Sequence, residues 1–229
     1  MQKTVFAILL ILGAAALLLS GLSEKLFHFG FTGHALADKM LRYQAFQYLV
    51  VAAVLGLTLA LGGNRGYLSR GNIDAPVEPV RFFGIAPGSR WRMTGLQLLL
   101  VISVVTAIFI GLGVYQSSKA PGWALLAGNL HWVILLSLLN SAGEELIFRF
   151  PLAALLEKEI PHLRILWLSA ILFGVPHYFG NPGGIGGIVL AGILGWVLVK
   201  SMLETRGMFW AVGIHFVQDV IIISSIFLL

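Results

Sequence analysis

Residues 141–149 read SAGEELIFR, and this stretch decides how the fold of the 229-residue chain is interpreted. It places two adjacent carboxylates and an arginine inside a run that is otherwise apolar enough to cross a bilayer. An ionisable residue at the centre of a membrane helix costs about 2.5–3.5 kcal/mol on insertion scales, so such residues usually face the interior of a helical bundle. The stretch therefore predicts a membrane helix with a functional polar face.

The spacing of the three charged residues assigns them different roles. On a helix Glu145 and Arg149 are four residues apart and share a face, where they can pair. Glu144 lies about 100° round the axis from Glu145. We interpret the Glu145–Arg149 pair as structural and Glu144 as free for chemistry. The alternative is an ion pair that only locks helix packing, which leaves Glu144 unpartnered. A polar stripe precedes Glu144 on nearly the same face: Ser137, Asn140 and Ser141.

The composition places the chain among polytopic membrane proteins. It is 58% hydrophobic and only 11% charged, which predicts one all-α membrane domain over residues 1–229. The absence of cysteine excludes disulfides and thiolate metal sites. A net charge of +5 would also suit nucleic acid, but the basic residues lie in loops, where anionic lipid is the expected partner. We therefore expect membrane lipid and no nucleic acid.

Seven apolar segments predict a helical bundle of seven to eight spans. They are residues 1–22, 44–62, 95–115, 130–157, 163–179, 185–202 and 208–229, and the last is interpreted as one helix or a broken one. Residues 20–22 make a poor cleavage site, so the first segment is taken as an uncleaved span. Pro151 can kink the fourth segment. The long loop of residues 63–94 either lies at the membrane surface or serves as a lid or docking loop.

The distribution of positive charge predicts the orientation. With alternating spans, one side collects eleven of the lysines and arginines and the other collects Lys25, Lys39, Arg42 and Lys119. The positive-inside rule then places the N-terminus and the long loop in the cytoplasm. We expect an integral, multi-pass protein of a prokaryotic inner membrane.

Three further ionisable residues lie in the late spans. His177 ends the sequence FGVPH, and His215 and Asp219 are four residues apart in the last span. The helical rise places these residues and Glu144 in a band about 10 Å tall. Such groups can activate water and stabilise an oxyanion, or bind zinc. The simpler alternatives are a histidine bonded to a backbone carbonyl and a self-satisfied His215–Asp219 pair.

These residues resemble a known family. The order Glu144-Glu145-x-x-x-Arg149, Phe173-x-x-x-His177 and His215-x-x-x-Asp219 is similar to the three-motif signature of the CAAX-protease and bacteriocin-processing (CPBP, or Abi) intramembrane protease family. The type II CAAX prenyl endopeptidase is its best-known member. The resemblance covers about residues 130–220, which we interpret as the catalytic core.

The resemblance implies a glutamate-dependent peptidase. Glu144 would act as general base on water, His177 would help to orient that water, and His215 would help to hold the oxyanion. The family often has asparagine at the last motif position, where this chain has Asp219. An ionised aspartate cannot donate a hydrogen bond. Asp219 is then protonated, or orients His215, or binds a metal. The metal-free mechanism is favoured, with zinc held by Glu144, His177, His215 and Asp219 as the alternative.

The predicted function is an intramembrane endopeptidase that hydrolyses a peptide bond within a membrane cavity by glutamate-activated water. Its substrate would be a peptide or protein, with a prenylated tail, a peptide precursor and a membrane-protein segment as candidates. The alternative from another class is a non-catalytic transport or immunity protein in which the same Glu and His residues carry protons or ions.

Overall fold

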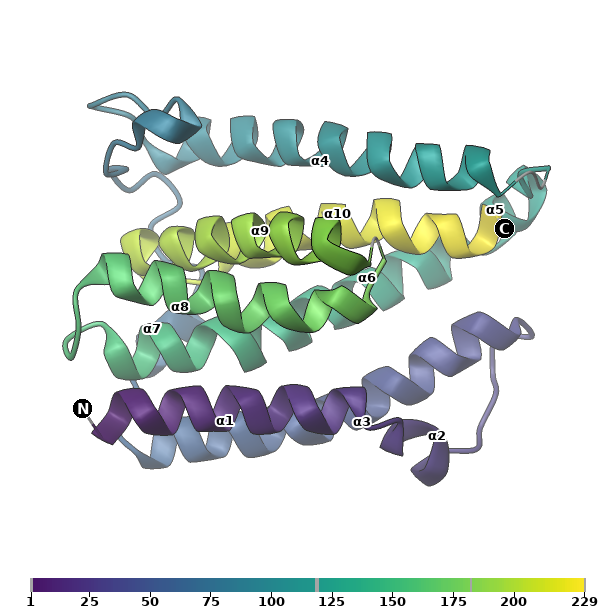
Figure 1. Ribbon diagram of the computed structural model, residues 1–229, viewed down its shortest axis with the longest axis horizontal. Coiled ribbons are helices and arrows are strands. Elements are labelled where there is room, and N and C mark those ends of the chain that lie inside the picture. The colour runs from purple at the N-terminus through teal and green to yellow at the C-terminus, as the bar shows by residue number, and fades with distance from the viewer. Residues whose placement is uncertain (1, 118–119, 182, 229) are drawn as a thin grey trace.

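The computed structural model describes residues 2–117, 120–181 and 183–228, which form helices, turns and two isolated β-bridges without a β-strand. Long helices lie side by side along the long axis of the molecule (Figure 1). The all-α prediction is therefore confirmed. Residues 1, 118, 119, 182 and 229 of the predicted membrane domain, among them Lys119 of the charge count, lie outside the described residues.

The N-terminal part contains α1 (Gln2–Leu19), the short α2 (Leu22–Leu26) and α3 (Ala35–Ala60). The expected start of the second span at Gln44 is wrong, because α3 begins at Ala35. The His34 ring caps this start by accepting a hydrogen bond from the Ala37 N–H. Asp38 in the first turn accepts two more backbone bonds from the preceding segment. These hydrogen bonds stabilise a helix start at Ala35, so residues 35–43 are helical although their polarity had suggested a loop between two spans.

The long loop forms an ordered layer at one end of the bundle. It contains η1 (Arg65–Leu68) and η2 (Arg81–Phe83), and it leads into α4 (Trp91–Gln116). The Asn72 N–H donates to the Thr205 carbonyl at 2.7 Å, which ties the loop to the end of α9 (Gly184–Thr205). Gly71 has φ +69°, and a Cβ there would lie 2.4 Å from the same carbonyl oxygen. Only glycine fits this contact.

The segment that holds the two glutamates is interrupted by a wider turn. After α5 (Trp123–Gly128), α6 (Leu130–Glu144) passes into a π-helical turn, η3 (Glu145–Arg149), and then α7 (Phe150–Leu156). The Phe150 N–H bonds to the Glu145 carbonyl, five residues back. Pro151 follows at once and cannot supply a backbone N–H, so the wider turn relieves the mismatch where a kink was predicted.

The C-terminal part packs closely. It consists of α8 (His162–Gly174), a 3-10 turn η4 (Val175–Phe179), α9 (Gly184–Thr205) and α10 (Phe209–Leu228). A Cβ on Gly195 of α9 would lie 3.0 Å from the Ser169 carbonyl oxygen of α8. The Ser169 hydroxyl also donates to the Gly195 carbonyl at 2.8 Å. The small residue lets the two helix backbones approach each other.

Five of the described helices are long and apolar enough to cross a membrane, namely α1, α3, α4, α9 and α10. The other two expected spans are divided by the π-helical turn and by the 3-10 turn, so neither is one regular helix of that length. The last apolar run is a single helix, α10. The chain is thus an integral membrane protein, and the count of seven to eight spans stays a prediction.

The helices alternate in direction between two ends (Figure 1). The N-terminus, the long loop and the connections α7–α8 and α9–α10 lie at one end, whereas α2, α5 and the C-terminus lie at the other. An ion pair of 3.0 Å between Lys3 and Glu159 joins two segments of the first end. This end carries the excess of basic residues. Which side of the membrane it faces stays a prediction.

Candidate active site

Glu145 and Arg149 form the predicted ion pair in the core of the bundle. Both side chains are fully buried, with Glu145 Oε1 3.4 Å from Arg149 Nη1. The guanidinium carbon of Arg149 lies 3.5 Å from the centroid of the Phe173 ring, a stacked cation–π contact. Burying a charge is costly unless it is paired, so this arrangement depends on both partners.

Glu144, the neighbour of Glu145, points instead into a cavity. Its side chain is 13% exposed, whereas that of Glu145 is fully buried. Glu144 Oε1 accepts a hydrogen bond of 3.3 Å from Asn140 Nδ2, and Oε2 lies 3.6 Å from His215 Nε2. The two adjacent carboxylates therefore have different surroundings, one enclosed and one accessible.

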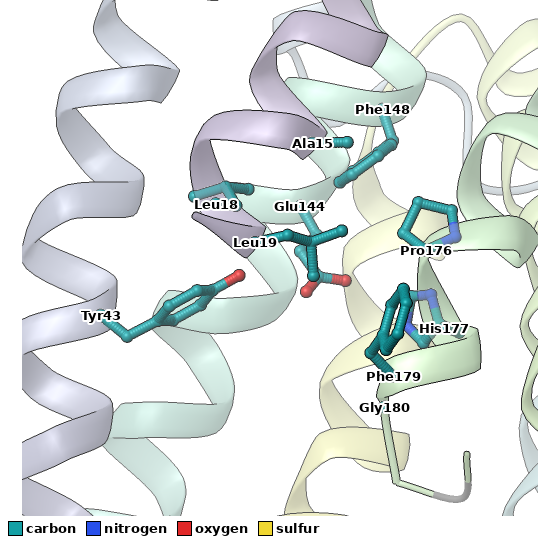
Figure 2. A pocket seen from close by; sticks show the side chains of 10 residues that line it. All are labelled: Ala15, Leu18, Leu19, Tyr43, Glu144, Phe148, Pro176, His177, Phe179 and Gly180. Carbon is teal, nitrogen blue, oxygen red and sulfur yellow. The ribbon is translucent and has the colours of Figure 1, made fainter. Parts of the chain in front are cut away.

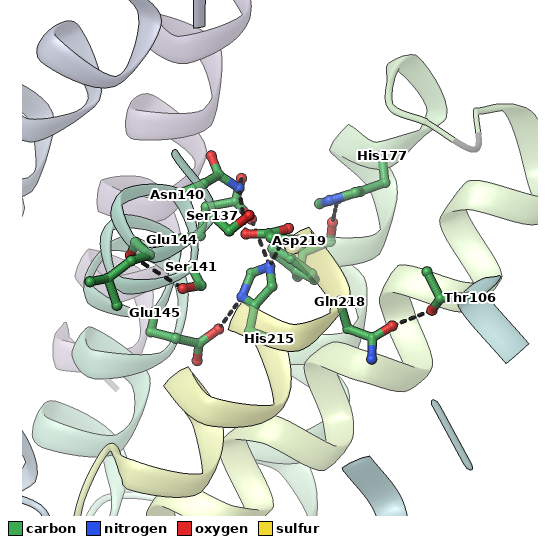
Figure 3. A network of polar contacts seen from close by, with 12 residues as sticks. Thr106, Ser137, Asn140, Ser141, Glu144, Glu145, His177, His215, Gln218 and Asp219 are labelled. Atoms are coloured by element: carbon green, nitrogen blue, oxygen red, sulfur yellow. Dashed lines mark hydrogen bonds and ion pairs between the residues drawn. The ribbon is translucent and has the colours of Figure 1, made fainter. Parts of the chain in front are cut away.

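His215 connects the structural pair to the cavity. Its Nδ1 lies 2.8 Å from Glu145 Oε1 (Figure 3). An ionised carboxylate only accepts hydrogen bonds, so Nδ1 carries the proton and donates it to Glu145. The ring is thereby fixed with Nε2 toward Glu144 and Asp219, whose Oδ1 lies 3.7 Å away.

Asn140 bridges the two carboxylates of the cavity. Its Nδ2 donates to Asp219 Oδ2 at 3.1 Å and to Glu144 Oε1 at 3.3 Å (Figure 3). Sequence reasoning placed Asn140 only in a polar stripe and gave it no role of its own. The available signal was its position one helical turn before Glu144. The partner on α10 was not visible in the sequence.

His177 lies in the 3-10 turn η4 on the other side of the cavity. Its Nδ1 lies 2.7 Å from the carbonyl oxygen of Phe173, so this nitrogen carries a hydrogen and donates it. The backbone bond that the simpler alternative expected is present. It occupies one nitrogen and leaves Nε2 as the ring atom that can serve the cavity.

The four predicted site residues lie around one cavity of about 390 Å³. Glu144, His177, His215 and Asp219 all line it, together with Asn140. Its remaining walls are mostly apolar side chains of α4 and α9, and Thr106 of α4 contacts Gln218 of α10 at its edge. The site is thus a small polar patch at the wall of an apolar chamber.

A second cavity, of about 210 Å³, lies on the side of α1 and α3 (Figure 2). It is lined by Glu144 and His177 and by residues of the N-terminal helices, including Leu18 and Tyr43. In Figure 2 the Glu144 carboxylate lies between the Tyr43 hydroxyl and the His177 ring. Glu144 and His177 therefore belong to the walls of both cavities.

The polar groups of the larger cavity are of the kinds that bind zinc. Among the described residues, no three His, Asp or Glu side chains are arranged so that they could hold a metal ion together. The Nδ1 atoms of both histidines donate to oxygen atoms, His177 to a backbone carbonyl and His215 to Glu145, which leaves Nε2 of each ring for the cavity. The metal-free mechanism and its zinc alternative both stay predictions.

Residues 126–221 match the family model described as type II CAAX prenyl endopeptidase Rce1-like. This part of the chain is Rce1-like. The match covers somewhat less than half of the chain, contains all three motifs and confirms the resemblance stated from them. No curated protein and no solved structure matches the chain.

The Rce1-like match supports a peptidase and, in general terms, an intramembrane CAAX-type protease that acts on a protein or peptide. It does not favour the transport or immunity alternative. Three helices outside the Rce1-like segment complete the cavities. The smaller cavity is completed by α1 and α3, and the larger one by α4.

Proposed function

We propose that the chain is an intramembrane endopeptidase that hydrolyses a peptide bond with water activated by Glu144. One observation carries the proposal: an accessible glutamate, two histidines and an aspartate line the same apolar chamber. The Rce1-like match supports the same class of reaction.

The proposed chemistry starts with Glu144. Its carboxylate takes a proton from a water molecule, and the water oxygen attacks the carbonyl carbon of the scissile bond. The tetrahedral intermediate collapses as the C–N bond breaks, and Glu144 passes the proton to the departing amine. His177 Nε2 lies on the same cavity wall and would orient the attacking water.

The negatively charged oxygen of the tetrahedral intermediate needs hydrogen-bond donors on the side of the scissile carbonyl away from the attacking water. His215 is held by Glu145 with Nε2 toward the cavity, and protonation of that nitrogen makes it one donor. Ionised Asp219 cannot be the second donor. We propose that one of the two Asn140 N–H groups turns from Glu144 to the oxyanion as Glu144 takes up the proton. Asn140 then supplies the amide N–H that the resembled family often has at the position of Asp219, and Asp219 orients Asn140 and His215.

This assignment predicts how substitutions of the pair will combine. Asn140→Ala removes the amide donor and should lower kcat about 10²–10³-fold, as for the loss of one oxyanion donor. Asp219→Asn should retain activity, because it adds an amide in the same place. The double variant Asn140→Ala/Asp219→Asn should recover most of the loss, measured as initial rates in proteoliposomes. A double variant as slow as Asn140→Ala would contradict the assignment.

We further propose that the reaction needs no metal. Treatment with EDTA or 1,10-phenanthroline, followed by desalting, should leave kcat unchanged within about twofold. Metal analysis of the untreated protein should give well below one zinc per chain. Loss of activity with a chelator, restored by added zinc, would overturn this part of the proposal.

The substrate class is tested with the purified protein in liposomes. A panel would contain prenylated peptides with a C-terminal CAAX-type tail, the same peptides without the lipid, and an unrelated transmembrane peptide. We propose that the prenylated tails are cleaved fastest, because the walls of the large cavity are apolar. Mass spectrometry of the products identifies the bond. Absence of cleavage across the panel would refute the CAAX-type assignment.

A further inference from the structure

The two cavities that meet at Glu144 differ in size, lining and surrounding helices. The larger, about 390 Å³, has apolar walls from α4 and α9. The smaller, about 210 Å³, lies against α1 and α3 and receives the Tyr43 hydroxyl (Figure 2). Glu144 and His177 separate them, so the proposed base can be reached from two sides.

We propose that the smaller cavity is the water supply of the site and that Tyr43 positions the water that Glu144 deprotonates. The inference rests on the proposed function and deepens it. It also gives a role to the N-terminal helices, which lie outside the Rce1-like segment.

Substrate and water would compete for the larger cavity. A peptide in the larger cavity would cover Asn140, His215 and Asp219, which line only that cavity. It would also displace water there, yet each hydrolysis consumes one water molecule. The smaller cavity borders Glu144 without bordering those three residues, so it remains open while substrate is bound.

The smaller cavity offers the polar groups that a water molecule needs. A buried water occupies about 30 Å³ and needs two to four polar partners. The smaller cavity has room for several such molecules and provides the Tyr43 hydroxyl, the Glu144 carboxylate and the His177 ring. The Tyr43 hydroxyl makes no hydrogen bond to another described residue, so it is available to the water. A phenol can donate to the water oxygen while Glu144 accepts the proton.

The absence of cysteine from the sequence permits a direct test with single-cysteine variants. Leu18 lines the smaller cavity and Ala191 lines the larger one, and both are 8% exposed. Leu9 of the same helix as Leu18 is 63% exposed on the outer face and serves as the lipid-facing control. A cysteine reacts with a charged methanethiosulfonate reagent as the thiolate, so it must be in contact with water that allows the thiol to ionise and the reagent to reach it.

In liposomes, Leu18→Cys should react at least about tenfold faster than Leu9→Cys, as measured by intact-protein mass spectrometry. A saturating prenylated peptide with a reduced scissile bond should protect Ala191→Cys and leave Leu18→Cys reactive. Equal rates for Leu18→Cys and Leu9→Cys, or protection of Leu18→Cys by the peptide, would overturn the proposal. Failure to protect Ala191→Cys would overturn the placement of substrate in the larger cavity. These readouts need no turnover, so they can fail independently of the peptidase proposal.

Kinetics test Tyr43 itself. Tyr43→Phe removes only the hydroxyl and should lower kcat about tenfold with KM unchanged, the size of one lost hydrogen bond to a charged or reacting group. Tyr48→Phe, on the next turn of α3, is the matched control, because its hydroxyl bonds to the Leu139 carbonyl and not to the cavity. An equal change of kcat in both variants, or a change of KM alone in Tyr43→Phe, would contradict the positioning role.

Discussion

Glu144→Gln is expected to abolish measurable peptide hydrolysis, with kcat lower by about 10²–10⁴-fold. Glutamine keeps the size of the side chain and still offers Oε1 to Asn140 Nδ2, so the local geometry is retained. It cannot take a proton from water at neutral pH, and this removes the general base. The measurement is single-turnover cleavage of a prenylated peptide in proteoliposomes, followed by mass spectrometry.

Glu159→Gln is the matched control for this variant. It makes the same chemical change at a partly exposed glutamate that pairs with Lys3 at the end of the bundle and lines neither cavity. Its rate should equal that of the unaltered protein. If Glu144→Gln cleaved peptide as fast as this control, another group would have to be the base. Equal thermal unfolding of the two variants would show that the loss is chemical.

Arg149→Met is expected to produce the largest loss of stability, about 3–5 kcal/mol. The substitution leaves the fully buried Glu145 carboxylate without its arginine and removes the stacked contact with Phe173. His215 still donates to Glu145, but one hydrogen bond does not replace the full positive charge. Thermal unfolding in detergent, with the fraction folded followed by fluorescence, measures the change.

Two further variants separate charge burial from general damage. Arg90→Met breaks an ion pair of 2.9 Å with Asp74 in which both side chains are exposed, so it should cost less than about 1 kcal/mol. Arg149→Met/Glu145→Gln removes both charges and should recover part of the stability, because no uncompensated charge stays buried. An Arg149→Met protein as stable as Arg90→Met would contradict the structural role of the pair.

The sequence alone was sufficient for the features that depend on residues close together in the chain. The length of the apolar runs predicts a helical membrane bundle, because each run must satisfy its own backbone within the lipid. The spacing of Glu145 and Arg149 predicts their ion pair, since four residues bring two side chains to one face. Each of the three motifs spans only five or six consecutive residues, and their order was enough for the family resemblance that the Rce1-like match confirms.

Local structure was less predictable where two tendencies compete. The early start of α3 depends on the cap by His34, and the π-helical turn before Pro151 depends on a shift of backbone hydrogen bonds. The order of apolar and polar residues predicts neither feature, because it contains no information on individual backbone hydrogen bonds.

Only the tertiary structure decided which groups surround Glu144. Asn140 meets Asp219 across two helices, and Tyr43 approaches Glu144 from a helix about a hundred residues earlier in the chain. These encounters depend on how α3, α6 and α10 are rotated against one another, which is set by packing over many residues at once. The sequence by itself therefore determined the chemical groups of the site, whereas the packing of the helices determined their partners and the two cavities through which they are reached.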